Sequence, residues 1–139
     1  MLSYQFSDDI LCAGQPNETD LQQLQKEGYR SIINLRPSHE PGQIPQAEQK
    51  VGELGMAYHA FPIAGPGDLN EENTRNFDEL LQKAARPTVI HCGSSNRVGA
   101  LMALRAAHVQ KKETGEALDD GRKAGLTALE PLVIQLLGL

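Results

Sequence analysis

The sequence predicts an α/β fold, in which a central, mostly parallel sheet of four or five strands is flanked by helices. Short apolar runs alternate along the chain with amphipathic stretches whose apolar residues recur at helical spacing. Apolar residues make up 40% and charged residues 22% of the chain, as is typical of globular proteins, and no repeat or low-complexity segment divides it. We therefore expect residues 1–139 to form one domain.

The first half of the chain supplies three predicted strands and two predicted helices. In order, these are a strand at 10–13, a helix at 20–27, a strand at 29–35, a helix at 45–54 and a strand at 56–61. Asn17 or Thr19 can cap the first helix, and Thr19 and Gln22 have the spacing of a capping box. Gly28 and Gly55 follow the two helices and are expected to end them.

The second half continues the alternation. It supplies a helix at 71–84, a strand at 88–91, a helix at 98–109 and one or two helices within 113–137, with a break near Gly125. The helix at 98–109 is apolar on nearly all sides, which is typical of a helix buried inside a small domain. Because ligands of parallel sheets bind at the carboxyl ends of strands, we expect the functional residues there.

Composition excludes several classes of function. Lys and Arg number 13 against 18 Asp and Glu, so the net charge of −5 disfavours nucleic-acid binding. No apolar run is long enough to span a membrane, and residues 1–4 do not begin a signal peptide, so a cytoplasmic location is expected. Cys12 and Cys92 are far apart in the chain and the four histidines lack metal-ligand spacing, so we expect neither a metal nor another cofactor.

One segment, His-Cys-Gly-Ser-Ser-Asn-Arg-Val at 91–98, combines residues suited to anion chemistry. It joins a predicted strand to a buried helix, so its backbone N–H groups can surround a tetrahedral anion. Gly93 and Asn96 are residue types that tolerate the positive φ of a curled loop. Arg97 offers a planar fork for two anion oxygens, and the same positive environment should make Cys92 a thiolate.

This segment resembles the signature of the cysteine-dependent phosphatases of protein-tyrosine and dual-specificity type, in which His-Cys opens the phosphate loop and Arg closes it. The upstream Cys-Ala-Gly-Gln-Pro at 12–16 and Ile-Ile-Asn-Leu-Arg at 32–36 resemble the small bacterial branch that includes the β-lactamase-hydrolase-like phosphatases. The resemblance covers about residues 8–110 and implies a phosphatase-like fold with the phosphate loop between the last strand and the buried helix.

The resemblance also implies an activity, the hydrolysis of a phosphorylated protein or small molecule through a cysteinyl-phosphate intermediate. It makes Cys92 the nucleophile and His91 a support for the loop, although a buried packing histidine is an equal alternative. The implied phosphate-binding residues are Gly93, Ser94, Ser95, Asn96, Arg97 and Val98.

The segment departs from the phosphatase pattern in two ways. Four residues separate Cys92 from Arg97, where the usual loop has five, and rhodanese-type sulfurtransferases also have the shorter loop. Val98 stands where a Ser or Thr usually helps the thiolate leave, a role left to Ser94 or Ser95. A sulfurtransferase, or a phosphate- or phosphopeptide-binding module with weak turnover, therefore remains an alternative.

The resemblance places the general acid on the loop after the third predicted strand, where Asp68 follows Gly65-Pro66-Gly67. Asp68 and Glu71 also have capping-box spacing, so Asp68 is equally predicted to cap the next helix. Glu71 and Glu72 are alternative acids, or first-turn residues that favour the helix dipole.

Further residues at the same sheet edge can form the rim of the site. Arg36 and His39 either contact the rest of a substrate or are solvated loop residues. Gln15 is a candidate for orienting a water or a phosphate oxygen, and Cys12 for a reversible disulfide with Cys92.

Overall fold

The computed structural model describes residues 1–138 and contains one five-stranded sheet. The strands, in the order in which they neighbour one another, are β1 (Ser3–Ser7), β2 (Ile10–Ala13), β5 (Thr88–His91), β3 (Ser31–Asn34) and β4 (Ala57–Ala60). All neighbouring pairs are parallel except β1 with β2. The predicted mostly parallel α/β fold is confirmed.

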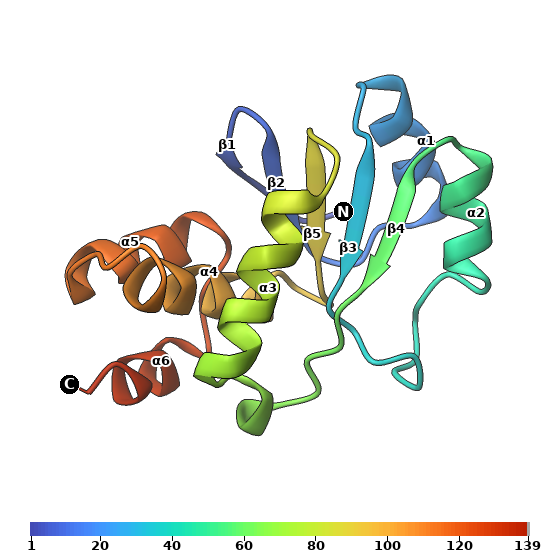
Figure 1. Cartoon of the computed structure of the whole chain (residues 1–139). Coiled ribbons are helices and arrows are strands. Elements are labelled where there is room, and N and C mark those ends of the chain that lie inside the picture. Colours follow the sequence, from blue (N-terminus) through green and yellow to red (C-terminus); the bar gives the residue numbers. More distant parts are fainter. Residues whose placement is uncertain (139) are drawn as a thin grey trace.

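The helices form two groups. They are α1 (Glu18–Lys26), α2 (Ala47–Glu53), α3 (Glu71–Lys83), α4 (Asn96–His108), α5 (Thr114–Lys123) and α6 (Glu130–Leu136), with a short 3₁₀ helix η1 (Pro66–Asp68) before α3. One buried cluster joins α1 and α2 to one face of the sheet, and a larger one joins α3 to α6 to the other face. In Figure 1, α4, α5 and α6 lie together beside the sheet. The predicted burial of the helix after β5 is confirmed, since eight residues of α4 are buried.

Strand β1 is an addition to the predicted elements. It pairs antiparallel with β2 and alternates in exposure, so that Tyr4 and Phe6 pack against the core while Ser3 and Gln5 face solvent. This alternation is the pattern of an edge strand with one buried face. The sequence did not predict this strand, because a half-exposed strand lacks the continuous apolar run that indicates a buried one.

The two helix caps predicted from the sequence have different outcomes. Asn17 as the cap of α1 is confirmed, in a reciprocal capping box with Asp20, whereas the pairing of Thr19 with Gln22 was wrong. Asn70 caps α3 by accepting from the backbone N–H of Asn73. The prediction that Asp68 caps this helix was therefore also wrong, because Asp68 lies within η1.

The strand register brings four loops to one edge of the sheet. Ala13 and Asn34 both lie opposite His91, so β2, β3 and β5 end at the same level, and β4 ends level with β3 at Ala60. The loops that follow these strands therefore start side by side at the carboxyl edge, where a parallel sheet binds its ligands. Among residues 1–138, no helix is both long and apolar enough to cross a membrane.

Candidate active site

The segment from Cys92 to Arg97, which consists of the connection between β5 and α4 and the first two residues of α4, is called the 92–97 loop, and it contacts the loop after β2. The backbone N–H of Cys92 donates to the carbonyl of Ala13 at 3.2 Å, and the N–H of Gln15 donates to the carbonyl of Gly93 at 3.0 Å. A Cβ on Gly14 would lie 2.8 Å from the Gly93 oxygen. The absence of a side chain at Gly14 therefore lets the two loops approach this closely.

Among the described residues, the backbone N–H groups of Gly93, Ser94 and residues 96–98 make no hydrogen bond, whereas the N–H of Ser95 faces the Ala13 carbonyl in the β-bridge between Gly14 and Ser94. A helix normally leaves its first N–H groups free, but here the run extends back through the preceding loop. Of these residues, Ser95 has a positive φ of 70°, so the expectation that Gly93 and Asn96 would take this conformation was wrong. A run of unpartnered N–H groups at a helix start favours an anionic ligand.

Arg97 is held at its end by Glu40, on the loop after β3. Arg97 Nη1 donates to Glu40 Oε2 at 2.8 Å and Nη2 donates to Oε1 at 3.0 Å, while Nη1 also donates to the Ile63 carbonyl at 2.8 Å. Among the described residues, the Nε–H and the remaining Nη2–H of Arg97 donate to no oxygen, and the guanidinium makes its further side-chain hydrogen bond with Cys92. These two N–H groups form the side-on fork of the guanidinium, which matches two oxygens of an oxyanion.

The charges around Arg97 stabilise one another. Hydrogen bonding to Arg97 lowers the pKa of Glu40 to about 2, against an opposing effect of burial and with a further contribution from Arg36. Burial lowers the pKa of Arg97, but its hydrogen bonds to Glu40 and the nearby Cys92 outweigh this effect and raise it. Arg97 and Glu40 are therefore both charged at neutral pH, with Arg97 beside Cys92.

Glu40 was not among the residues predicted from the sequence. It is the last of three rim residues that are connected by hydrogen bonds. Gln15 Oε1 accepts from Arg36 Nη1 at 2.8 Å, and Arg36 Nε donates to Glu40 at 2.9 Å. Arg36 and Gln15 thus position Glu40, whereas His39 is exposed. The available signal was the four-residue spacing of Arg36 and Glu40 in a loop at the carboxyl edge, which resembles any solvated ion pair.

Cys92 lies at the start of the loop and is only 1% exposed. Its side chain belongs to the same buried cluster as Cys12, which lies opposite Ile90 on the neighbouring strand. Burial raises the pKa of Cys12 to about 12, with a smaller contribution from Cys92, and both cysteines are free thiols. Cys12 is therefore protonated at neutral pH, and both thiols are almost entirely shielded from solvent.

His91 lies below the loop and is 3% exposed. Burial lowers its pKa to about 4, although its contact with the Cys92 backbone opposes this effect. The ring is therefore neutral at neutral pH, and its Nδ1 lies 3.3 Å from the Cys92 carbonyl oxygen. As the donor in this pair, Nδ1–H would support the loop backbone in the predicted way, from a buried position.

Asp68 lies on the loop after β4, which also provides the Ile63 carbonyl that Arg97 contacts. The Asp68 carboxylate is half-buried and accepts from the backbone N–H of Ala64 at 2.8 Å. The predicted acid thus lies on a loop that also contacts Arg97, but its carboxylate makes its hydrogen bond within that same loop. The alternative acids, Glu71 and Glu72, lie exposed in the first turn of α3, and Glu71 pairs with Arg75.

Val98, Ser94 and Ser95 are the positions considered for a hydroxyl that helps the Cys92 thiolate leave, and they differ in their surroundings. Val98 is fully buried in the core. Ser95 is also buried, and its hydroxyl donates to the Ala124 carbonyl at 2.6 Å. Ser94 is the exposed one, so it is the serine whose hydroxyl faces solvent.

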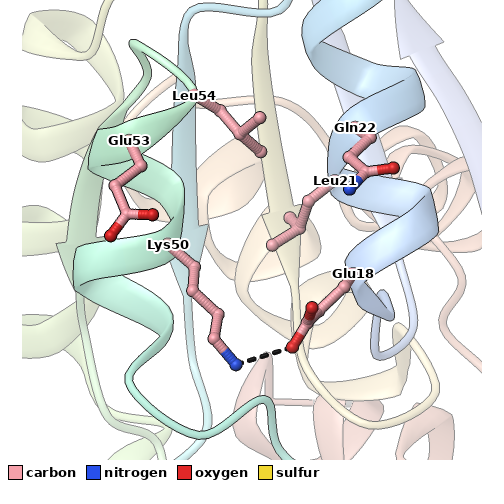
Figure 2. A pocket seen from close by; sticks show the side chains of 6 residues that line it. All are labelled: Glu18, Leu21, Gln22, Lys50, Glu53 and Leu54. Carbon is pink, nitrogen blue, oxygen red and sulfur yellow. Dashed lines mark hydrogen bonds and ion pairs between the residues drawn. The ribbon is translucent and has the colours of Figure 1, made fainter.

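Hollows also lie outside the loop itself. One of about 600 Å³ is bounded by the loop after β3 and by β4, and Arg36 and Glu40 form part of its wall. Another of about 210 Å³ lies between α1 and α2, where Glu18 and Lys50 form a 2.6 Å ion pair (Figure 2). The smaller hollow holds none of the candidate catalytic residues. No three His, Cys, Asp or Glu residues among those described are grouped to hold a metal ion.

A five-stranded, mostly parallel sheet with a Cys-to-Arg loop between β5 and a buried helix defines a protein-tyrosine-phosphatase-like fold. A candidate phosphatase from Neisseria meningitidis Z2491 superposes with a TM-score of 0.80 at 23% identity, covering 96% of this chain and 94% of that one. Pseudomonas aeruginosa TpbA, solved in complex with pTyr, superposes with a TM-score of 0.67 at 14% identity, covering 98% and 82%.

Sequence comparison identifies the family. A family model described as "Beta-lactamase hydrolase-like protein, phosphatase-like domain" matches residues 4–109. The β-lactamase hydrolase-like protein of Agrobacterium fabrum strain C58 is 31% identical over 128 residues, or 90% of this chain. The chain belongs to this phosphatase-like family, and it spans 30% of the length of that relative. The resemblance noted in the sequence is confirmed.

Proposed function

We propose that the chain is a cysteine-dependent phosphomonoester hydrolase. The observation that carries this proposal is the combination of the unpartnered N–H groups of Gly93, Ser94 and residues 96–98 with the side-on fork of Arg97, which donates to no oxygen and lies beside Cys92. Together they provide donors for the oxygens of a phosphoryl group next to a sulfur nucleophile. An aligned nucleophile and preorganised donors are the main requirements of phosphoryl transfer.

In the first step, the Cys92 thiolate attacks phosphorus and the bond to the leaving oxygen breaks. Arg97 and the loop N–H groups hold the non-bridging oxygens, and Asp68 gives its proton to the leaving oxygen. In the second step, water attacks phosphorus, the S–P bond breaks, and Asp68 takes the proton of the water. Inorganic phosphate leaves and the thiolate is restored.

Two features of the site determine what the cycle requires. Because Cys92 is 1% exposed, the groups around Arg97 must move to admit the substrate. Because Asp68 Oδ2 accepts from the Ala64 N–H, Oδ1 is the oxygen left to carry the proton that Asp68 gives as acid. The complex of TpbA with pTyr supports a phosphorylated protein or small molecule as substrate.

The test is hydrolysis of an aryl phosphate by the purified protein in the presence of a metal chelator. We expect turnover, inhibition by vanadate and loss of activity in Cys92→Ser. Cys12→Ala is the matched control, since it removes the other buried thiol of the same cluster and leaves the loop sequence intact. Activity that survives Cys92→Ser would refute the proposal.

Sulfur transfer is a second candidate, favoured by the four-residue spacing, by Val98 in place of a hydroxyl residue and by the bonded Ser95 hydroxyl. The Cys92 thiolate would attack the outer sulfur of thiosulfate and release sulfite. Cyanide would then take this sulfur from the Cys92 persulfide as thiocyanate. Thiocyanate formation together with the mass of one added sulfur on Cys92, without phosphatase turnover, would favour this function.

The same features also allow a phosphate-binding module with weak turnover. In that case the first step proceeds and the second is slow, so phosphocysteine accumulates. Tight vanadate binding with a persistent phosphoryl group on Cys92 would distinguish this alternative from both enzymes.

A further inference from the structure

We infer that residues 124–129, the connection between α5 and α6, form part of the active site as a brace for the 92–97 loop, with Asn96 as the positioning residue that joins them. This inference rests on the proposed function and extends it to a segment beyond the family match at 4–109. We call residues 124–129 the C-terminal brace. Three independent contacts support the inference.

The first contact is made by Asn96, the residue before Arg97. Its side-chain Oδ1 accepts from the backbone N–H of Thr127 at 3.0 Å, from the N–H of Leu129 at 3.2 Å and from the Thr127 hydroxyl at 3.3 Å. A carbonyl oxygen has two lone pairs, so these donors use its full capacity. The Asn96 side chain therefore binds the brace.

The second contact involves Ser95, which has a φ of 70°. Its buried hydroxyl donates to the carbonyl of Ala124 at 2.6 Å. A non-glycine residue in this conformation is strained and needs surroundings that hold it there. The brace provides such surroundings, since a Cβ on Gly125 would lie 2.6 Å from both the Cβ and the Oγ of Ser95.

In the third contact, the C-terminal brace packs against the first turn of α4. A Cβ on Gly99 would lie 2.2 Å from the backbone nitrogen of Leu126. The backbone of the brace thus rests directly on α4, two residues after Arg97. A side chain at position 99 would push the brace away from the loop.

These contacts hold a short loop in shape. Two of the four residues between Cys92 and Arg97 direct their side chains to the brace, while the N–H groups of Gly93, Ser94 and residues 96–98 remain without an acceptor among the described residues. Displacing Ser95 and Asn96 would therefore move these N–H groups and the backbone of Arg97, from which its side chain extends. A displacement of about 1 Å in a positioned site can cost about 100-fold in rate.

The experiment compares Gly125→Ala with Gly55→Ala. Both glycines have positive φ, 103° and 80°, so both substitutions introduce similar backbone strain, but a Cβ at Gly55 meets nothing within 4 Å. We expect both variants to have a lowered Tm. Only Gly125→Ala should bind tungstate about 10- to 100-fold more weakly, because only there does the new Cβ displace Ser95.

A second pair, Asn96→Ala and Asn17→Ala, tests the side-chain contact. Asn17 caps α1, so its loss destabilises the fold without touching the brace. For each variant, the rate of alkylation of Cys92 by iodoacetamide is measured against pH. We expect the midpoint to move up by about one pH unit in Asn96→Ala, because displaced loop N–H groups no longer favour the thiolate, and to stay unchanged in Asn17→Ala.

The two readouts separate the brace from the proposed function. Failure of the wild-type protein to bind tungstate would count against the proposed function, while the alkylation profiles would still compare the variants. The brace is refuted if Gly125→Ala and Asn96→Ala change only Tm and match their controls in tungstate affinity and alkylation profile.

Discussion

The two loops that the proposed mechanism needs are held in different ways. The 92–97 loop is fixed from three sides, by the loop after β2, by Glu40 and by residues 124–129. Asp68, on the loop after β4, makes a single side-chain hydrogen bond, to the Ala64 N–H in its own loop. The Cys92–Arg97 half of the proposed site is therefore the more firmly held half, and the Asp68 half is the more movable one.

The largest effect on the fixed half is expected from Arg97→Lys. Lysine keeps the charge but cannot offer the side-on fork while also pairing with both oxygens of Glu40. We expect kcat/KM for an aryl phosphate to fall about 1,000-fold, the upper range for loss of an oxyanion donor. Unchanged kcat/KM would show that the fork does not hold the phosphoryl oxygens.

The corresponding change in the movable half is Asp68→Asn. Asparagine keeps an oxygen that can accept from Ala64, so the Tm should remain unchanged. We expect kcat/KM, which reports the first step alone, to fall about 100-fold for an alkyl phosphate and far less for nitrophenyl phosphate, whose leaving group needs no proton. Equal losses for both substrates would argue against Asp68 as the acid.

Glu40→Gln should have a smaller effect, about a tenfold loss of tungstate affinity, because glutamine keeps one acceptor for Arg97 but loses the charge. Since Arg97 lowers the pKa of Glu40 from 4.5 to about 2, the stability from this pair is complete above pH 4.5. It is lost as pH falls through about 2. Tungstate titrations at pH 5 and 7 should therefore show the same ratio between wild type and variant, and a ratio that disappears at pH 5 would contradict this assignment.

The last prediction concerns the stability of the fold and depends on His91, whose burial lowers its pKa from 6.5 to about 4. A depressed pKa means that the unfolded chain binds the proton more tightly, so stability is present above pH 6.5 and is lost as pH falls toward 4. Between pH 7 and pH 5 we expect a loss of about 2 kcal/mol from this residue. Urea unfolding of wild type and His91→Gln at both pH values would test it, and equal pH dependence would contradict it.

The helices and most strands of the fold could be predicted from the sequence because local patterns of apolar residues encode them. The apolar run at 88–91 and the nearly all-apolar helix after it predicted β5 and α4, and with them the place of Cys92 and Arg97. Strand β1 was missed because only Tyr4 and Phe6 of its five residues pack against the core.

The partners of the site residues could not be predicted in the same way. Glu40 is 57 positions from Arg97, and Thr127 is 31 positions from Asn96, so only the folded chain brings these pairs together. The cap of α3 was assigned to Asp68 because its spacing to Glu71 is correct, yet Asn70 lies closer to the helix start and has the same ability to accept. Spacing identified the type of contact but not which residue makes it.

The most direct test of the central claim is to mix the protein with an aryl phosphate, quench the reaction rapidly in acid and locate any added group by peptide mass spectrometry. The account predicts a phosphoryl group on Cys92 that forms before steady state and is absent in Cys92→Ser. Continued hydrolysis with Cys92 unmodified at every time point would contradict it.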